Sequence, residues 1–342
     1  FATLRTMARF RGHFFNWYDT RTLEPLMPQY VSTVDSGNLA GHLIAVKQGC
    51  LDITERPLFD ARLIKGLTDT IDLLREEARK LAPLQQRTQV VTIKELRKEI
   101  ELCAGLVATD SPQALDAWNA LFESLAQHAA AVEDIVGALS QEHGSGGFEE
   151  LNYWVAALLH QTRAVRRDMG TLTPWAGKLA THAAFIIKNC PPDIIALCEG
   201  LAGALDDVSS LAQMPEDCES ALERLEALRS IIEARSLDAI PEREAVLDIL
   251  SLLEVNLEEA SAAAKSALAR SSTLIGQCDQ TVSEMDFRFL LDDERKVFRI
   301  GYNVTDGRAD NSFYDLLASE SRLASFCAIA RGDVAAAVAA AS

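Results

Sequence analysis

The chain has 342 residues, of which 48% are hydrophobic, and a formal net charge of −17 at pH 7. This apolar content is enough for a packed core of two or three structural units. The acidic balance disfavours binding to nucleic-acid backbones or to anionic lipid headgroups, whereas it is compatible with a neutral ligand such as a sugar.

Targeting and metal signals are missing from the sequence. No apolar run is long enough to span a bilayer, and no signal-peptide pattern opens the chain, so we expect a segment exposed to the cytosol. The chain begins at Phe1 rather than Met, which indicates a fragment. Its seven cysteines form no Cys-x-x-Cys pair, and the six histidines have no zinc spacing. We predict buried thiols, and neither a metal nor a cofactor in this segment.

The first segment, residues 1–51, is rich in aromatic residues and proline. In Asn16-Trp17-Tyr18-Asp19, two aromatic rings stand beside an amide and a carboxylate. Sugar subsites combine a ring that stacks with polar groups that fix hydroxyls, so Trp17, Tyr18 and Asp19 are candidate substrate-binding residues. Packing of the rings in a core is the commoner explanation of such a pattern.

A second motif follows in the same segment. Residues 31–34 are predicted to be extended and a helix to begin near Ser36, with Leu39, Leu43 and Val46 on one face. Asp35 and Asn38 are candidates for hydrogen bonds to sugar hydroxyls. The pattern by itself favours Asp35 or Ser36 as the helix N-cap.

The remaining chain divides into three segments. Residues 52–284 are predicted to be almost entirely helical and to form long helical hairpins. Charged pairs recur between Leu and Ala positions, which indicates helices with one solvent-exposed polar face. Residues 285–334 begin with alternating apolar positions around 292–295, which predict a β-hairpin. A helix is then expected from Ser312 or Phe313 to about Arg331. Residues 335–342 form an alanine-rich tail.

The last predicted helix carries the sharpest chemical signal. Its apolar residues form one stripe at 100° per residue, with Glu320 in the middle. Desolvation raises the pKa of an inward carboxylate, as a general acid requires. A buried ion pair with an arginine explains the same position equally well. Asp315 lies off the stripe near the helix start, where capping or the helix dipole accounts for it.

These motifs together resemble a known family. Residues 16–20, 25–28, 30–43 and 313–323 closely resemble the central segment of cyclic β-1,2-glucan synthases, and residues 285–302 are similar to the same segment. The helical segment 52–284 matches the family only in its general helical character, without a specific motif. The resemblance implies a glycosyltransferase part that uses UDP-glucose and a divalent metal, followed by a glucoamylase-like (α/α) barrel and a phosphorylase-like part. It also implies a membrane-anchored protein, with this segment on the cytoplasmic side of the bacterial inner membrane.

The resemblance assigns roles to residues of the last helix. It implies that Glu320 is one of two catalytic carboxylates of a transglycosylation that closes linear β-1,2-glucan into a ring, and that Tyr314, Asp315 and Arg322 contact substrate. In the family the second carboxylate follows beyond the end of this sequence, and residues 335–342 depart from the family pattern. We therefore expect the fragment to hold glucan but to turn it over poorly or not at all.

The expected fold is mainly α, with partial (α/α) barrel-like elements, long helical hairpins and one short β-hairpin. We expect the first and last segments to pack together, since each carries apolar faces that need a partner. The expected partners are β-1,2-glucan and other domains of the same polypeptide, not nucleic acid. Two rival hypotheses are a non-catalytic helical scaffold and a glucan-binding segment that cuts no bonds.

Overall fold

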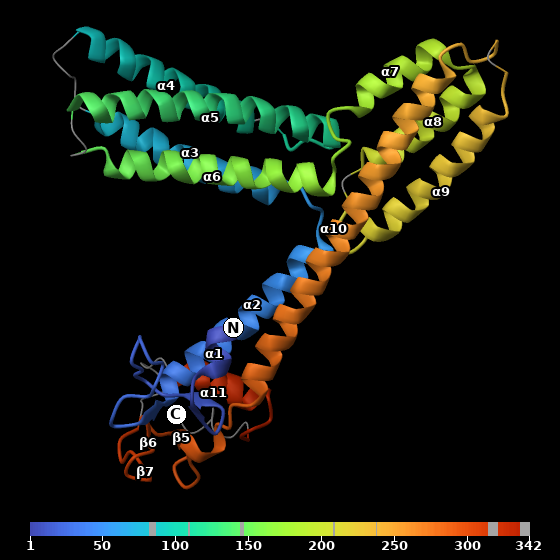
Figure 1. Ribbon diagram of the computed structural model, residues 1–342. Coiled ribbons are helices and arrows are strands. Elements are labelled where there is room, and N and C mark those ends of the chain that lie inside the picture. The colour runs from blue at the N-terminus through green and yellow to red at the C-terminus, as the bar shows by residue number, and fades with distance from the viewer. Residues whose placement is uncertain are drawn as a thin grey trace. The chain divides into compact units, whose positions relative to one another are not determined.

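The computed structural model describes residues 1–81, 87–108, 110–143, 147–207, 209–236, 238–313 and 321–335, except for the side chains of 87–91 and 142–143. The chain forms two compact units (Figure 1). Unit 1 comprises Phe1–Thr54 and Leu268–Ser342, and unit 2 comprises Glu55–Ala267. The predicted mainly α class with a short β-hairpin is confirmed. None of the described helices is both long and apolar enough to cross a membrane.

Unit 2 begins with four long helices, α3 (Ala61–Lys80), α4 (Arg87–Val107), α5 (Leu115–His143) and α6 (Glu149–Leu172). Each packs against two of the others, so that they enclose one apolar core. The sequence of α3 shows why: Leu67, Ile71, Leu74 and Ala78 recur at helical spacing, and none of them is more than 1% exposed. The Asp60 side chain accepts the N–H of Arg62 and caps this helix at its start.

The other helices of unit 2 are α7 (Leu179–Asn189), α8 (Pro192–Leu205), α9 (Met214–Glu233) and the part of α10 (Arg243–Ser283) that ends at Ala267. Both α8 and α9 have proline in the first turn, where its missing N–H costs no hydrogen bond. Trp175, in the connection that leads to α7, is 4% exposed and donates its indole N–H to the carbonyl of Leu205 at 2.9 Å. This bond fixes the end of α8.

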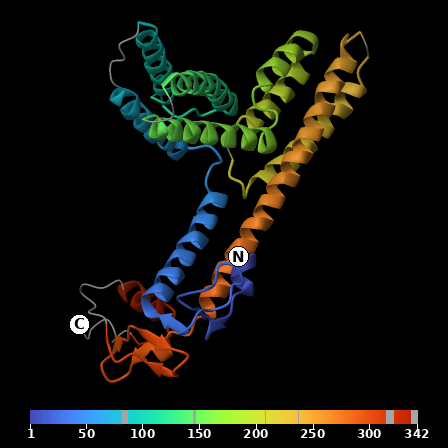
Figure 2. The same cartoon turned by 60° about the vertical axis from the view of Figure 1, so that its left-hand side comes forward.

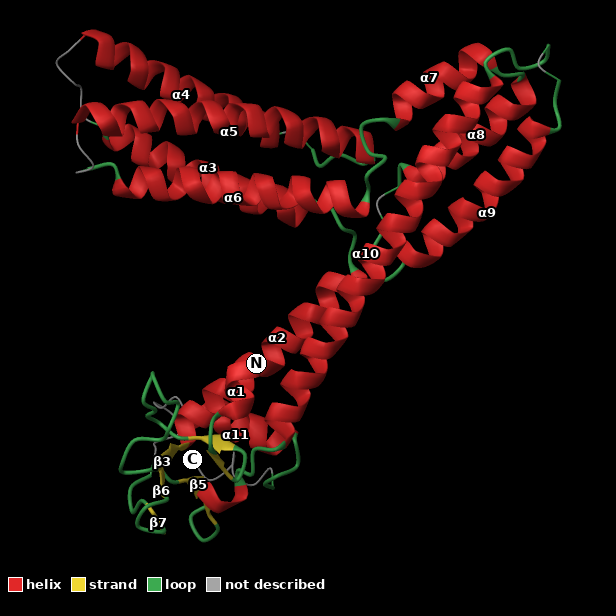
Figure 3. Ribbon diagram, viewed as in Figure 1, coloured by secondary structure: helices red, strands yellow, loops and turns green. Residues whose placement is uncertain are grey.

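Unit 1 contains every described strand (Figure 3). Its elements are α1 (Ala2–Thr6), β1 (Arg9–Phe10), β2 (His13–Phe14), β3 (Tyr30–Ser32), α2 (Thr33–Glu55), the part of α10 from Leu268 onward, a 3₁₀ turn (Arg288–Leu290), β4 (Leu291–Asp292), β5 (Val297–Phe298), β6 (Gly301–Asn303), β7 (Arg308–Ala309) and α11 (Ser321–Ala330). Strands β3, β6 and β7 form one antiparallel sheet in that order, in which Val31 is opposite Tyr302. The prediction that the two terminal segments pack together is confirmed.

Two predicted boundaries in residues 285–334 need correction. The β-hairpin exists as β4–β5, with Leu291 opposite Phe298, but residues 288–290 form a 3₁₀ turn and not a strand. The helix expected from Ser312 or Phe313 does not begin there, because Phe313 forms an extended bridge with Arg299. Backbone pairing with residues 299–300 therefore overrides the helical pattern at this point.

The start of α2 also differs from the prediction. The helix begins at Thr33, so Asp35 and Ser36 lie inside its first turn and neither is the N-cap. The cap is Ser32, whose hydroxyl accepts the N–H of Asp35 at 3.2 Å. Ser32 and Asp35 have the spacing of a capping box, a signal that the interpretation of the sequence overlooked. Leu43 is buried as predicted, whereas Val46 is 44% exposed.

Two glycines let α2 and α11 approach each other closely. A Cβ atom on Gly37 would lie 2.4 Å from the Cβ of Ala324 and 2.6 Å from its Cα. A Cβ atom on Gly41 would lie 2.7 Å from the side chain of Leu323. In unit 1, α2 also lies beside α10 (Figure 2), where Lys47 pairs with Asp279 at 2.8 Å. Gly37 and Gly41 therefore serve the packing of α2 against α11.

Replacing Gly37 with alanine should destabilise unit 1 by about 1–3 kcal/mol, because the added methyl overlaps backbone atoms of α11 that cannot move alone. Gly49→Ala is the matched control, since a methyl group at this position of the same helix would have nothing within 4 Å. The control should be neutral or stabilise by up to about 1 kcal/mol. Urea unfolding can be followed through the indole signal of Trp17, the one tryptophan of unit 1. Equal midpoints for Gly37→Ala and Gly49→Ala would contradict the close approach.

Candidate functional site

The Asn16–Asp19 motif runs along the edge of β3. The backbone N–H of Asn16 donates to the carbonyl of Tyr30 at 2.9 Å, and its side-chain carbonyl accepts the N–H of Ser32 at 3.1 Å. Trp17 is 51% exposed, and its ring is tilted by 34° to the ring of Tyr30 at a centroid distance of 6.3 Å. Trp17 is therefore held in place from one side and open to a ligand on the other.

Tyr18 and Asp19 have structural contacts. The Tyr18 hydroxyl donates to the carbonyl of Ala8 at 2.7 Å and accepts the N–H of Phe15 at 2.9 Å, and burial raises the pKa of Tyr18. The Asp19 carboxylate accepts the N–H groups of Arg21 and Thr22, which lower the pKa of Asp19. These contacts shape the loop that carries Trp17. Sugar binding by Tyr18 and Asp19 stays a prediction.

Ser32 joins the two motifs of the first segment. Its N–H donates to the Asn16 side chain, and its hydroxyl accepts the N–H of Asp35. Asp35 is exposed on the first turn of α2, and Asn38 is half-buried one turn later, where its carbonyl lies 2.6 Å from the ring of His42. The structure thus connects the Trp17 loop with the start of α2 through one residue.

The residues of the last motif lie only partly in the described chain. Tyr314, Asp315 and Glu320 lie outside the described residues, so their predicted roles stay predictions. Arg322 is exposed in the first turn of α11, and Ser321 before it is buried. Because Ala324 contacts Gly37, the first turn of α11 lies against the first turns of α2. Two motifs far apart in the sequence therefore meet here.

Near this region, Tyr30, Arg299 and Asp310 form polar contacts that were not predicted from the sequence. The Tyr30 hydroxyl donates to the carboxylate of Asp310 across a separation of 280 residues. Arg299 donates to the backbone carbonyl of Asp310 at 2.8 Å, pairs with the carboxylate of Asp292, and has its guanidinium 5.2 Å from the ring centre of Phe313. No local sequence pattern links these positions, because the pairing of β3, β6 and β7 creates them.

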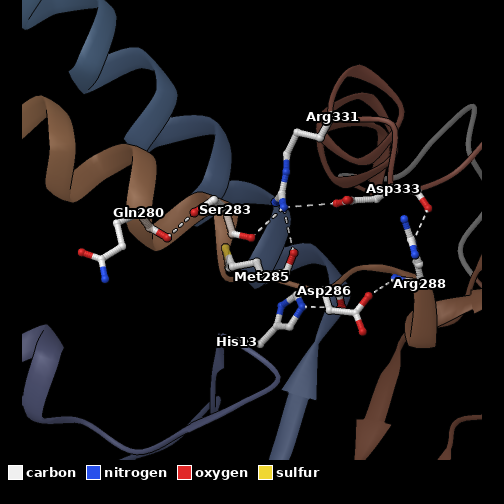
Figure 4. Close-up of polar contacts among 8 residues, drawn as sticks. All are labelled: His13, Gln280, Ser283, Met285, Asp286, Arg288, Arg331 and Asp333. Atoms are coloured by element: carbon white, nitrogen blue, oxygen red, sulfur yellow. Dashed lines mark hydrogen bonds and ion pairs between the residues drawn. The ribbon is translucent and has the colours of Figure 1, made fainter.

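A second polar cluster lies at the end of α10 (Figure 4). Arg331 donates to the carbonyls of Ser283 and Met285 at 3.2 and 3.1 Å and lies 3.4 Å from the carboxylate of Asp333. His13 is fully buried, with its Nε2 atom 2.8 Å from the carbonyl of Asp286. A fully buried imidazole cannot reach a ligand in solution. This cluster therefore connects α10, α11 and β2, and is not a candidate site.

The β1–β2 turn fits tightly against the same end of α10. Arg11 and Gly12 both have positive φ, +49° and +84°, as a two-residue type I′ hairpin turn requires. A Cβ atom on Gly12 would lie 1.9 Å from the carbonyl oxygen of Glu284, so only glycine fits. The carbonyl of Arg11 accepts the N–H of Asp286 at 3.1 Å. These contacts hold His13 in place.

Within the described ranges, no group of three or more His, Cys, Asp and Glu residues is arranged to hold a metal ion. All seven cysteines lie in these ranges and are free thiols, five of them buried. Burial raises the pKa of Cys103 to about 12, so this thiol stays protonated near neutral pH. The predicted buried thiols are thus confirmed for most of the cysteines.

Comparison with known proteins extends the resemblance along the chain. No family model matches. The cyclic β-(1,2)-glucan synthase NdvB of Rhizobium meliloti (strain 1021) is 29% identical over 334 residues, which are 97% of this chain. The resemblance to cyclic β-1,2-glucan synthases is confirmed. The aligned residues also include most of the helical segment 52–284, which contains none of the motifs quoted from the sequence. The chain spans 9% of the length of that synthase.

Acid should destabilise unit 1 through His13. Burial lowers the pKa of His13 from about 6.5 to about 4, and the charge of Arg331 contributes, against the opposing effects of the Asp286 carbonyl and carboxylate. The unfolded chain therefore takes up a proton below about pH 6.5, whereas the folded chain does so only near pH 4. This contribution to stability is complete above pH 6.5 and is lost as the pH falls, by about 2 kcal/mol between pH 7 and pH 5.

The measurement is the urea midpoint of unit 1 at pH 7 and pH 5. His13→Gln should lower the midpoint at pH 7 but reduce its fall toward pH 5, because the titrating group is gone. His160→Gln, at an exposed position on α6, should keep the full fall. A His13→Gln chain with the same acid sensitivity as the parent chain would exclude His13 as the cause.

Proposed function

We propose that this chain is an internal segment of a cyclic β-1,2-glucan synthase and that unit 1 forms part of the site where linear glucan is closed into a ring. The observation that carries the proposal is the 29% identity to such a synthase along 97% of the chain. The geometry supports it, because Ser32 links the loop of the half-exposed Trp17 to the start of α2, against which α11 begins. A binding surface for a sugar chain needs such an exposed ring beside polar groups.

The proposed chemistry is a retaining transglycosylation. Two carboxyl groups about 5–5.5 Å apart act as nucleophile and as acid/base. The nucleophile attacks the anomeric carbon of an internal β-1,2 bond and the acid protonates the departing oxygen, so that bond breaks and the piece beyond it leaves as a shorter glucan. The hydroxyl at the other end of the retained piece, deprotonated by the same acid/base group, then displaces the nucleophile in place of water and closes the ring. Glu320 is proposed as one of these groups, and the second comes from outside this chain. Trp17 supplies a stacking surface, while Tyr18, Asp19, Asp35, Asn38, Tyr314, Asp315 and Arg322 are the proposed polar and aromatic substrate contacts. The isolated chain is accordingly expected to bind glucan without closing it.

The whole protein is proposed to be a membrane-anchored synthase that acts at the cytoplasmic side of the bacterial inner membrane. Its glycosyltransferase part would use UDP-glucose and a divalent metal, and the segment described here would use neither. Other domains of the same polypeptide are the proposed protein partners. The charge of −17 fits a neutral glucan better than an anionic ligand.

A second candidate function, a helical scaffold, is favoured by unit 2. Several large apolar side chains there are exposed by 46–51%: Ile187, Leu197, Leu252 and Val255. An apolar cavity between α7, α8 and α10 lies in the same part of the unit. Exposed apolar surface of this kind is typical of contacts with other protein domains. The two functions are compatible, since they concern different units.

Replacing Trp17 with alanine should weaken the binding of linear β-1,2-glucan to the chain by about fivefold or more, because a ring contact of about 1 kcal/mol is lost. Helical content should not change, since half of the ring faces solvent. Tyr153→Ala is the control, as this aromatic residue of unit 2 is 62% exposed. Titration calorimetry that gives the same affinity for Trp17→Ala and the parent chain would remove Trp17 from the site.

Replacing Glu320 with glutamine in the longer synthase should abolish most ring closure. Loss of general acid–base catalysis alone costs about 10²–10⁴-fold, and loss of a nucleophile costs more. The melting temperature should hardly change, because the amide keeps the shape and removes a charge. Glu294→Gln, at an exposed turn of the β4–β5 hairpin, should leave both quantities unchanged. If Glu320 is instead a structural ion-pair partner, activity will persist while stability falls by roughly 3–5 kcal/mol.

A further inference from the structure

Unit 2 contains a cavity of about 260 Å³ with a mixed lining. It lies where the start of α5, the connection between α6 and α7, the end of α8 and the first half of α9 come together. The polar part of its lining comprises Thr173, Asp207, Ser209, Asp217, Ser220 and Arg224, and the apolar part includes Trp175, Leu115 and Met214. Its polar and apolar surfaces are of similar extent, unlike the almost wholly apolar cavity between α7, α8 and α10.

One wall of the cavity is formed by the residues that directly follow α8, and hydrogen bonds within the protein hold this wall in place. The carbonyl of Asp206 accepts the N–H of Leu115 at 3.1 Å, and the carboxylate of Asp206 accepts the N–H of Asp116 at 3.2 Å. The carbonyl of Ser209 accepts the N–H of Leu58 at 3.0 Å, and the indole of Trp175 holds the carbonyl of Leu205. Three separate segments therefore hold this wall. A preformed wall lowers the entropy cost of binding.

The charges around the cavity select the class of ligand. Asp217 contributes a carboxylate and Arg224 a guanidinium, so these two charges of the lining are opposite and equal in number. Arg224 is exposed and has no ion pair or hydrogen bond within the part of the chain that the structure describes. An anion would be repelled by the carboxylate of Asp217, whereas neutral hydroxyl groups can donate to a carboxylate and accept from a guanidinium. This combination fits a polyhydroxylated neutral ligand.

We propose that this cavity of unit 2 binds a pyranose unit, as a second sugar-binding site separate from the Trp17 region. Its volume is below the about 300–1,000 Å³ of sites that bury drug-sized ligands, so it takes a short stretch of sugar rather than a long chain. Arg224 donates to ring hydroxyls, and Asp217 and Ser220 accept from them. The choice of β-1,2-linked glucose as the ligand rests on the proposed function. In a synthase, such a site would hold glucan outside the ring-closing region.

The test uses the four tryptophans of the chain as separate reporters. In protein labelled with ¹⁵N-tryptophan, the indole signals of Trp17 and Trp175 are assigned with Trp17→Phe and Trp175→Phe. Titration with sophorose, the β-1,2-linked glucose disaccharide, should shift the Trp175 signal in a saturable way. Arg224→Ala should weaken this response about tenfold or more, the loss expected for hydrogen bonds from a charged donor. Arg166→Ala, another exposed arginine of unit 2, should leave it unchanged.

The two signals separate the two proposals. A shift at Trp17 with none at Trp175 supports the proposed function and overturns the second site. A shift at Trp175 that persists in Arg224→Ala with unchanged affinity also overturns it, as does the absence of any shift up to high sugar concentration. Inorganic phosphate is titrated in parallel, and an Arg224-dependent response to phosphate but not to sophorose would show an anion site instead.

Discussion

The close approach of α2 and α11 is the constraint on which the candidate site depends. Gly37 leaves no room for a side chain, so Ala324 packs directly against the backbone of α2. This contact fixes the start of α11 relative to Ser32, which in turn holds the loop of Trp17. If an added methyl group pushed the two helices apart, the Trp17 loop, the start of α2 and the start of α11 would no longer keep their relative positions. The geometry of the candidate site thus depends on the packing of Gly37 against Ala324.

The sequence predicted the kind of elements better than their ends. Regular spacing of apolar residues identified the helical middle, the hairpin at 291–298 and the burial of Leu43, because local periodicity determines these features. It failed at Thr33 and Phe313, where a cap and a backbone bridge decide the boundary. The sequence predicted no role for Gly37 and Gly41, since the residues that they contact lie in α11. Contacts between distant segments leave no local pattern.

The same limit applies to the candidate site. Trp17 was identified from residue type alone, and its half-exposed ring agrees with a surface role. Tyr18 and Asp19 were indistinguishable from it in the sequence, although their polar atoms are engaged by the backbone of their own loop. Asp310 and Arg299 were not found at all, because only the pairing of β3 with β6 brings them near Tyr30. The cavity of unit 2 is likewise formed by three helices and the segments that connect them, and by no single motif.

The pairing of β3 with β6 has a consequence for synthesis on the ribosome. Tyr30 meets Asp310 only after 280 further residues have been made, and at about 5–20 residues per second this takes about 15 s to a minute. During that time the whole of unit 2 emerges, while the first segment of unit 1 has neither its partner strand nor α11. The nascent chain therefore carries an unpaired β3 strand, and Gly37 and Gly41 of α2 stay uncovered, until β6 and α11 have been made. An unpaired strand edge of this kind is a site where chains can associate wrongly during synthesis.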